Sequence, residues 1–434
     1  MSGEWRRVTV DEIAVKISMG PFGSDIKTDN FVSCGVPVIR GGNLTTGRFN
    51  GEAFVFLTDA KADELMNSNA YPGDIIFTHR GTLGQVGLVP DIPFSRYVVS
   101  QSQLKLTCDR RVAEPVFVYY YFKSPEGQTS LLANTSQTGV PAISRPVTSL
   151  KSIDIPLPPL PEQRRIAKIL GDLDDKIELN RKMNETLEQM ARALFKSWFI
   201  DFDPVRAKMD GRMPEGMDAD TAALFPSRLV ESELGLVPEG WEVKALGDVV
   251  ECIGGGTPST KEGSYWNGGA INWATPKDLS SLQAPLLTAT ERSITDSGLT
   301  RVASGLLPAR TLLMSSRAPV GYLAISTIPV AINQGFIAMP ESSVMTSLYM
   351  LHWCNANMIE IQGRASGTTF AELSKSNFRQ MRMLLPSGQL VKTFSHMVSY
   401  YYNQIETNIH QSRTLASLRD TMLPKLMAGR IDLC

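Results

Sequence analysis

The sequence of 434 residues predicts an α+β protein with a pseudo-two-fold internal repeat. We expect two globular domains of α/β type, joined by two long helices that pair antiparallel as a coiled coil. Three observations lead to this expectation. An apolar seam runs through residues 158–198, a related stretch begins 228 residues later at Pro386, and similar segments precede both stretches. A repeat of this kind implies one structural unit per copy.

Residues 1–157 form the first predicted domain. Short apolar runs at residues 36–44, 73–89 and 98–106 are separated by turns of Gly, Pro, Asn and Ser, which is typical of short strands. A helical segment follows near residues 116–123. An apolar strand from Ile153 then leads into the first long helix.

The first long helix is predicted within residues 158–203. Seam residues recur in steps of four and three, which is the spacing of a coiled coil. Pro161 suits a first helical turn, and Pro204 suits a stop. The predicted seam consists of Ile166, Leu170, Leu173, Ile177, Asn180, Asn184, Leu187, Ala191, Leu194 and Trp198.

Residues 204–234 are rich in Met, Asp, Pro and Gly, and they predict a loose linker or an irregular arm instead of a domain. The second domain, residues 235–385, repeats the order of the first. Arg80 and Arg317 occupy the same place in the two copies, each four residues before a glycine.

The second long helix and a tail are predicted within residues 386–434. Arg419 interrupts its seam, and Pro424 predicts an early end. Asn180 aligns with Asn408, and a buried Asn in a seam fixes register at a cost in stability, so the two helices are expected to pair with each other. The predicted seam here consists of Phe394, Val398, Tyr401, Ile405, Asn408, Leu415 and Met422.

Composition is that of an ordinary globular protein, with 43% hydrophobic and 20% charged residues. The net charge of −1 argues against a simple sequence-independent binder of nucleic acid, although basic residues clustered in one groove stay possible. No run approaches the length of a membrane span. Five scattered cysteines without a CxxC motif predict no disulfide framework and no zinc site, and a cytoplasmic location fits.

Motifs for catalysis are missing from the sequence. The run GGGTPSTK at Gly254 lacks the Gly-Lys pair of a phosphate-binding loop, and a turn is the better interpretation. None of the four histidines has metal-ligand spacing. Glu242 and Lys244 have the spacing of some nucleases but follow a turn. We therefore expect no catalytic residue and no metal site.

Each half instead offers polar loops suited to DNA. Arginine can donate two hydrogen bonds to guanine, Asn or Gln can pair with adenine, and hydroxyls and lysines suit phosphates. The competing interpretation is that these residues form turns and caps; for Arg80 and Arg317, DNA contact and a structural salt bridge both stay open. The candidates are Arg40, Asn43, Thr78, His79, Arg80, Gln101, Gln103, Gln137 and Thr138 in the first half, and Thr275, Lys277, Asp278, Ser315, Ser316, Arg317, Asn333, Gln334, Arg364, Thr368 and Thr369 in the second.

Aromatic residues gather at the end of the first long helix. We expect Phe195, Trp198, Phe199 and Phe202 to be exposed and to form a docking site for another protein, because clustered exposed aromatics mark interfaces. The alternative is that long amphipathic helices make plain core or dimer contacts.

These motifs resemble the specificity subunits of type I restriction–modification systems, the HsdS family. The resemblance covers the whole chain and rests on the EW and GW openings, IRGGNL, ATPKDL, FTHRGTLGQVG, INQG, LPPLPEQRRIAKIL, DDKIELNRKMNETLE and ALFKSWFIDFDPV. The second helix departs from the pattern, since PSGQLVKTF replaces the Pro-Glu-Gln form.

The resemblance implies a mechanism. Each globular domain would be a target-recognition domain for one half of a split site in double-stranded DNA, and the helices would hold the halves apart. The helices would also recruit two methyltransferase subunits and the restriction or motor subunits. S-adenosylmethionine, ATP and Mg would belong to those partners, and this chain would bind no cofactor.

Two other classes of function remain open at the level of sequence. One is a non-catalytic adaptor that holds two protein-binding domains on a helical rod, and it predicts no sequence-selective DNA binding. The other is an enzyme with an unrecognised site, which predicts turnover by the isolated chain.

Overall fold

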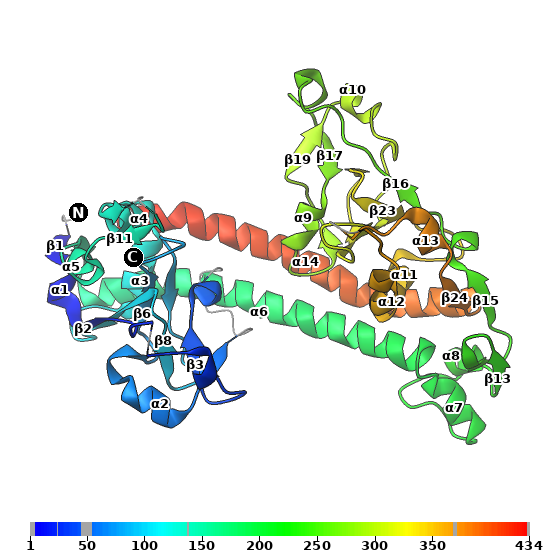
Figure 1. Cartoon of the computed structure of the whole chain (residues 1–434), viewed down its shortest axis with the longest axis horizontal. Helices are drawn as coiled ribbons and strands as arrows, with labels where there is room; N and C mark the ends of the chain where they lie inside the picture. Colours follow the sequence, from blue (N-terminus) through cyan, green and yellow to red (C-terminus); the bar gives the residue numbers. More distant parts are fainter. Residues whose placement is uncertain (1–4, 24, 45–53, 137–138, 368–370, 432–434) are drawn as a thin grey trace. The chain divides into compact units, whose positions relative to one another are not determined.

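The computed structural model describes residues 5–23, 25–44, 54–136, 139–367 and 371–431 (Figure 1). The chain divides into two compact units. Unit 1 comprises Met1–Ile177 and Ser412–Cys434, and unit 2 comprises Glu178–Gln411. The helices α6 (Leu160–Phe199) and α14 (Gly388–Met427) each contribute one part to each unit. Compactness therefore groups parts of both helices with each globular region, whereas the sequence-based boundaries set the helices apart.

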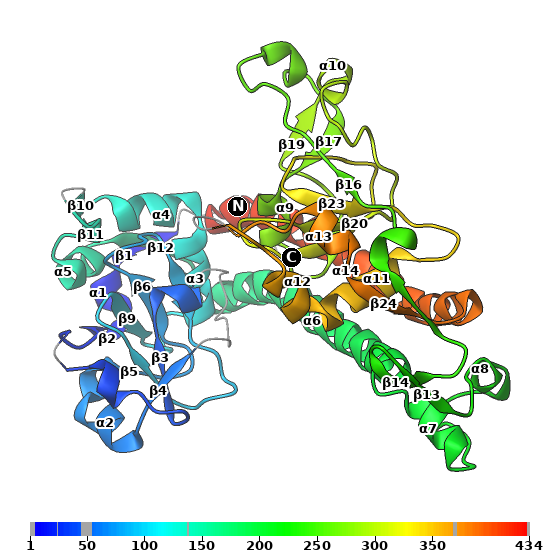
Figure 2. The same cartoon turned by 45° about the vertical axis from the view of Figure 1, so that its right-hand side comes forward.

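Unit 1 contains two small sheets of four strands each and a two-stranded ribbon formed by its first and last strands (Figure 2). The ribbon pairs β1 (Arg6–Thr9) antiparallel with β12 (Asp154–Leu157). The first sheet has the order β2-β9-β6-β7, from Ala14–Met19, Gln103–Cys108, Ile75–Thr78 and Val86–Leu88. The second has the order β4-β3-β8-β5, from Val55–Leu57, Val36–Ile39, Tyr97–Val99 and Asn69–Ala70.

Helices complete the core of unit 1. The helices are α1 (Val10–Ile13), α2 (Asp59–Glu64), α3 (Pro115–Lys123), α4 (Pro125–Leu132) and α5 (Pro146–Lys151), with the short strands β10 (Thr135–Ser136) and β11 (Ala142–Ile143). Helix α3 is buried on nearly every side. It packs against the first sheet and against parts of both long helices. Its Phe117 shares one buried cluster with Ile166 of α6 and Leu426 of α14.

Unit 2 repeats this plan. Its ribbon pairs β15 (Glu242–Ala245) with β24 (Arg382–Leu385). The first sheet has the order β16-β23-β20-β21-β18, from Ile253–Gly254, Phe336–Met339, Leu312–Ser315, Leu323–Ser326 and Leu286–Leu287. The second has the order β19-β17-β22, from Arg292–Ile294, Ile271–Ala274 and Ala331–Ile332. The helices are α9 (Pro276–Ser280), α10 (Asp296–Leu299), α11 (Ser347–Ala356), α12 (Met358–Gly363) and α13 (Lys375–Arg379).

The register of the strands shows that the two units are structural copies. In unit 1, β3 runs parallel to β8 and antiparallel to β4. In unit 2, β17 runs parallel to β22 and antiparallel to β19. Strand β6 pairs with β7 and β9 as β20 pairs with β21 and β23. The predicted α+β class and internal repeat are confirmed by this shared topology.

The long helices pair antiparallel within unit 2. Asn408 donates a 2.8 Å hydrogen bond to Asn184, and further along the pair Phe195 lies 5.6 Å from Phe394 between ring centroids. From the first contact to the second, the residue number rises along α6 and falls along α14, so the helices run in opposite directions. The side-chain amide of Asn180 donates to the Gln411 side chain at 2.9 Å, and its nitrogen lies 3.5 Å from the Asn408 carbonyl oxygen.

Every predicted seam residue is buried or half-buried in the structure. In the described part of the chain the buried ones are Ile166, Leu170, Asn180, Asn184, Ala191, Trp198, Phe394, Val398, Ile405 and Asn408, and the half-buried ones are Leu173, Ile177, Leu187, Leu194, Tyr401, Leu415 and Met422.

Within unit 1, Arg419 does not interrupt the helix pair as the sequence suggested. Its guanidinium lies 2.5 Å from the buried carboxylate of Asp174, and the hydroxyl of Tyr120 donates to the same carboxylate at 2.6 Å. The charge is therefore accommodated by an ion pair between α6 and α14. The 228-residue offset places Tyr402 and Ala191 at the equivalent positions of unit 2, where no charge occurs.

Pro424 does not end the helix early, contrary to the sequence-based expectation. Helix α14 continues through Pro424 to Met427. A proline costs one backbone hydrogen bond in a helix, but Leu423, Leu426 and Met427 are buried in the core of unit 1. Their burial offsets the lost hydrogen bond, since a buried large apolar side chain contributes about 1.5–3 kcal/mol.

The predicted loose linker is an ordered arm that packs on unit 2. It contains α7 (Asp203–Met209), α8 (Ala219–Ala223) and a hairpin of β13 (Leu229–Ser232) and β14 (Gly235–Pro238). Val205 and Phe225 are buried in the core of the unit. Of the two predicted alternatives, an arm fits the structure and a loose linker does not, because a few apolar residues spaced along this polar segment hold it in place.

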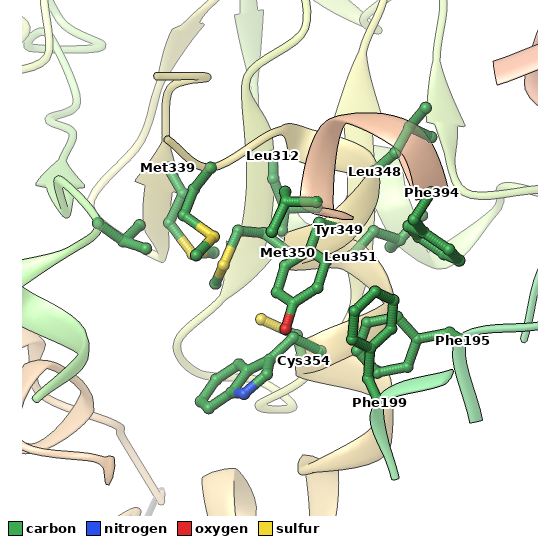
Figure 3. Close-up of a cluster of buried hydrophobic side chains, with 14 of the residues drawn as sticks. Phe195, Phe199, Leu312, Met339, Leu348, Tyr349, Met350, Leu351, Cys354 and Phe394 are labelled. Atoms are coloured by element: carbon green, nitrogen blue, oxygen red, sulfur yellow. The ribbon is translucent and has the colours of Figure 1, made fainter. Parts of the chain in front are cut away.

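The aromatic residues at the end of α6 are buried, which corrects the expectation that they are exposed. Phe195, Trp198, Phe199 and Phe202 retain at most 9% of their surface. Figure 3 shows Phe195 and Phe199 pointing toward Phe394 and Tyr349, and Phe199 lies 5.0 Å from Tyr349 in an edge-to-face contact. These side chains form part of the core of unit 2, so these four residues do not offer a docking surface.

Among the helices in the described ranges, none combines the length and the apolar character that crossing a bilayer requires.

The pairing of Asp174 with Arg419 predicts a specific stability effect. Arg419→Ala leaves a buried carboxylate without its cation, which costs about 3 kcal/mol in comparable buried pairs. We expect that loss in urea unfolding of the full chain, and partial recovery when Asp174→Ala is added. The control is Arg192→Ala on α6, whose surface pair with Glu188 should contribute less than about 1 kcal/mol. Equal effects of Arg419→Ala and Arg192→Ala would contradict a structural role for the buried pair.

Candidate nucleic-acid interface

Loops gather at one edge of unit 1 because β3 and β8 are parallel, so both strands end at the same edge. The side chain of Gln85 donates to the Gly41 carbonyl at 3.1 Å, and the amide of His79 donates to Ser102 at 3.0 Å. The amide of Gly81 donates to Pro141 at 2.9 Å. These bonds join residues 40–44, 78–85, 100–103 and 139–143 into one surface, which we call loop cluster 1.

Four of the predicted side chains in loop cluster 1 are buried and hold the loops together. Asn43 accepts from the Arg40 amide at 2.9 Å, and Thr78 donates to Gln85 at 2.8 Å. Gln103 is fully buried and donates to Thr78 at 3.4 Å. Buried polar groups of this kind satisfy turn hydrogen bonds. The structure therefore corrects the expectation that Asn43, Thr78, His79 and Gln103 present their side chains to DNA.

His79 is a structural residue of the same kind. It is 7% exposed, and its Nε2 lies 3.0 Å from the Gln101 carbonyl oxygen. Burial lowers the pKa of His79, and the charge of neighbouring Arg80 also lowers it, against the effect of the hydrogen bond to Gln101. The ring is therefore held neutral, with its N–H directed at the carbonyl that it pins.

The remaining candidates of unit 1 are exposed or lie outside the described residues. Arg40, Arg80 and Gln101 are exposed. Gln137 and Thr138 lie outside the described residues. The surface of loop cluster 1 thus carries two guanidinium groups and one amide on a frame of buried hydrogen bonds.

Unit 2 has the equivalent surface. The amide of Asn333 donates to Ala274 at 3.1 Å, Ser316 to Gly335 at 2.8 Å and Leu373 to Ser316 at 2.9 Å. These bonds join residues 274–278, 316–322, 332–335, 364–367 and 371–373, which we call loop cluster 2. Ser316 thus donates through its amide and accepts through its carbonyl, as His79 does in unit 1. The His79 amide donates to Ser102, and its carbonyl accepts from the Ile143 amide at 2.8 Å.

Several predicted side chains of loop cluster 2 also serve the frame. Ser315 and Ser316 are buried, which corrects the expectation that they present hydroxyls to DNA. Thr275 and Asp278 form a capping box at the start of α9, and Asp278 also accepts from the Glu291 amide at 2.7 Å. Asn333 accepts from Gly335 at 2.8 Å. These residues position the loops, as the cap-and-turn interpretation anticipated.

Basic and amide groups face outward from loop cluster 2. Lys277 pairs with Glu291 at 2.8 Å and Arg364 with Glu360 at 2.7 Å. Gln334 is exposed and accepts a hydrogen bond from Thr257. Thr368 and Thr369 lie outside the described residues.

Arg80 and Arg317 occupy equivalent backbone positions. Each forms an isolated bridge to the last loop of its cluster, Arg80 with Ala142 and Arg317 with Glu372. The Arg317 guanidinium lies 3.8 Å from the Glu372 carboxylate, and both side chains are at least one-third exposed. Among the residues that the structure describes, no carboxylate pairs with Arg80. An exposed pair contributes about 0–1 kcal/mol, so neither arginine is required for stability.

A fifth loop in each unit escaped the sequence analysis. It follows β2 in unit 1 and β16 in unit 2, and it lies against the loop that contains Gln101 or Gln334. A Cβ on Gly20 would lie 1.9 Å from the Ser100 carbonyl oxygen, and one on Gly255 would lie 2.0 Å from that of Ile332. The available signal was a glycine-containing turn directly after a strand in both halves; the second-half run at Gly254 was interpreted as a turn, and its match with Gly20 in the first half was not recognised.

Comparisons with known proteins agree with this duplicated plan. A family model described as the type I restriction modification DNA specificity domain matches residues 4–189 and 238–414. The Type I restriction enzyme HindI specificity subunit of Haemophilus influenzae is 28% identical over 402 residues, which cover 83% of this chain and 86% of that protein. The MjaIX specificity subunit of Methanocaldococcus jannaschii is 34% identical over 190 residues, 43% of this chain and 44% of that protein.

A solved structure shares the fold across the chain. The crystal structure of the S subunit of the type I restriction-modification system from M. genitalium matches with a TM-score of 0.56 and 17% identity, covering 97% of this chain and 96% of that one.

The buried ring of His79 predicts a pH effect on stability. The pKa of His79 is lowered in the folded state, so the unfolded chain binds more protons as the pH falls below about 6.5, and the folded state loses stability there. His79→Gln keeps a donor for the Gln101 carbonyl but cannot titrate. We expect its urea midpoint to fall less than that of the wild type between about pH 7.5 and about pH 5. If the urea midpoint of His79→Gln falls as much as that of the wild type over this pH range, His79 is not held neutral in the folded state.

Proposed function

The chain belongs to the type I restriction–modification DNA specificity family, and from this premise we propose how it divides the reading of DNA between its two units. It is the specificity subunit of a type I restriction–modification system, binds the DNA target of that system and is a non-catalytic component. Loop cluster 1 reads one half of a split site in double-stranded DNA, and loop cluster 2 reads the other.

One observation carries the proposal. The two loop clusters are built by equivalent strands and equivalent backbone hydrogen bonds. They share an arginine and a glutamine at equivalent positions but differ at others, since exposed Arg40 in unit 1 has the place of half-buried Thr275 in unit 2. A common frame with different exposed groups is what two readers of different base sequences require, because base edges are distinguished by side-chain hydrogen bonds.

The exposed residues have the chemistry for this role. In unit 1, Arg40 and Arg80 suit guanine or phosphate, and Gln101 suits adenine. In unit 2, Arg317 and Gln334 have the equivalent positions, and Lys277 and Arg364 suit phosphates. The buried side chains of both clusters act by positioning these groups.

The long helices set the spacing between the half-sites in this proposal. Each has 40 residues, a length of about 60 Å at 1.5 Å per residue. Each contributes one segment to each unit. The buried amides of Asn180, Asn184 and Asn408 support a fixed register, because sliding would leave polar groups buried without partners.

A type I system assembles from several kinds of subunit with DNA, and cofactors belong to the partner subunits. We propose that this chain recruits two methyltransferase subunits and restriction or motor subunits in the cytoplasm, with S-adenosylmethionine, ATP and Mg held by those partners. The exposed apolar side chains of Leu179, Met183 and Met190 share one face of α6 and offer a contact for the methyltransferase subunit, in place of the buried aromatics.

The first test is genome-wide adenine methylation in cells that hold the native partner subunits, with and without this chain. A split motif that depends on the chain is the expected result. Its absence, with partners verified as expressed, would contradict the proposal and favour an adaptor function.

Two arginine variants assign the halves. We expect Arg80→Ala to weaken recognition at one half-site only and Arg317→Ala at the other, each by about 1–3 kcal/mol if the side chain contacts a base. The matched control is Arg192→Ala on α6, which should leave the motif unchanged. A loss shared equally by every DNA sequence would reassign the residue to phosphate contact, and effects of both variants on the same half-site would contradict the division between units.

A further inference from the structure

The loop after β2 brings an aromatic side chain to loop cluster 1. Gln101 is an exposed residue of that cluster, and a Cβ on Gly23 would lie 2.8 Å from its Oε1. Phe22 precedes Gly23 and is 81% exposed. A large apolar side chain therefore stands in solvent directly beside residues that we propose to face DNA.

The backbone on both sides of Phe22 is fixed. Gly20 packs against the Ser100 carbonyl so closely that any side chain would collide with it. The amide of Phe22 donates to the Asp25 carboxylate at 3.2 Å, and the amide of Asp25 returns a bond to the Phe22 carbonyl at 2.9 Å. Pro21 is buried. Contacts of Gly20 and Pro21 on one side and hydrogen bonds with Asp25 on the other thus hold Phe22 at this surface.

The copy in unit 2 provides a comparison. Met19 pairs with Leu104 in unit 1 as Gly254 pairs with Ile337 in unit 2, and this register makes Thr257 the equivalent of Phe22. Thr257 is also exposed, and its hydroxyl donates to Gln334, the equivalent of Gln101. The same position therefore presents an aromatic ring in one unit and a hydroxyl in the other.

Exposure alone would not single out Phe22, because isolated exposed apolar residues are normal. Ile92 is similarly exposed, at 75%, in the turn before β8 at the opposite edge of the sheet. Three features distinguish Phe22. Packing and hydrogen bonds hold its backbone, the neighbouring Gly23 lies against Gln101, and the equivalent residue in unit 2 is of a different type.

We propose that Phe22 determines specificity by an apolar contact with the C5-methyl group of a thymine in the half-site read by unit 1. A phenyl ring cannot hydrogen-bond to a base edge, and the thymine methyl is the apolar feature that the major groove presents. The inference rests on the proposed function of loop cluster 1 and adds the kind of base feature that this cluster recognises.

The test uses the full chain assembled with its native partner subunits and a duplex that carries the split motif defined by methylation in cells. The half-site of unit 1 is the one altered by Arg80→Ala. Each thymine there is replaced singly by deoxyuridine, which removes only the methyl group. We expect one replacement to weaken binding by about fourfold, the equivalent of one methyl group lost from an apolar contact.

Variants of Phe22 complete the cycle. Phe22→Ala and Phe22→Thr, the latter carrying the residue of unit 2, should weaken binding to the thymine duplex and abolish the effect of that deoxyuridine. Ile92→Ala is the control and should retain both affinity and the deoxyuridine effect. Thermal unfolding of both Phe22 variants should match the wild type, because the side chain is exposed.

Several results would overturn the inference. They are a half-site without thymine on either strand, a wild-type complex insensitive to every deoxyuridine, and a Phe22→Ala complex that keeps its sensitivity. Failure of the proposed function looks different, because no split motif would then depend on the chain or Arg80→Ala would alter neither half-site.

Discussion

Neither unit has a complete core without both long helices, and the rest of the structure depends on this constraint. Unit 1 takes Ile166 from α6 and Leu426 from α14 into the cluster around Phe117, and unit 2 takes Phe195 and Phe394 into its own. Each such side chain contributes about 1.5–3 kcal/mol when buried. Each globular part therefore folds onto the helix pair, and the burial of helix side chains in the two cores in turn stabilises the helix pair. In the function that we propose, a subunit that spaces two half-sites needs this coupling, because readers that moved freely against the helices would not keep their half-sites in register.

Polar groups inside the helix pair decide how the helices align. Hydrophobic seams tolerate sliding, whereas a buried amide or charge that loses its partner costs about 1–3 kcal/mol or more. The amides of Asn180, Asn184 and Asn408 meet within unit 2, and Asp174 meets Arg419 within unit 1. The repeat maps Asn180 onto Asn408 but maps the charged pair onto uncharged residues. The two copies thus share the asparagine that sets the register of the helices. The charged pair of Asp174 and Arg419 has no charged equivalent at the matching positions of unit 2.

The loop clusters separate positioning from recognition. Buried side chains such as His79, Gln103 and Asp278 complete hydrogen bonds between loops, while Arg80, Gln101 and Gln334 stand on the surface. A frame held by buried hydrogen bonds tolerates changes in the exposed groups, since surface substitutions usually alter stability by less than about 0.5 kcal/mol. In the proposed function, this division allows one architecture to read two half-sites with different bases.

The sequence by itself determined the duplicated α+β plan, the two long helices and the correspondence of Arg80 with Arg317, because periodicity and repetition are visible in one dimension. It also pointed to the loops that gather at the ends of the parallel strands. The tertiary structure decided which loop residues are buried, since Asn43 and Arg40 look equally polar in a list but only one completes a turn. It placed Phe195 and Phe199 in the core, paired Arg419 with Asp174, ordered the arm of residues 204–234 and brought Phe22 beside Gln101. These outcomes depend on contacts between residues far apart in the chain, which spacing along one segment does not encode.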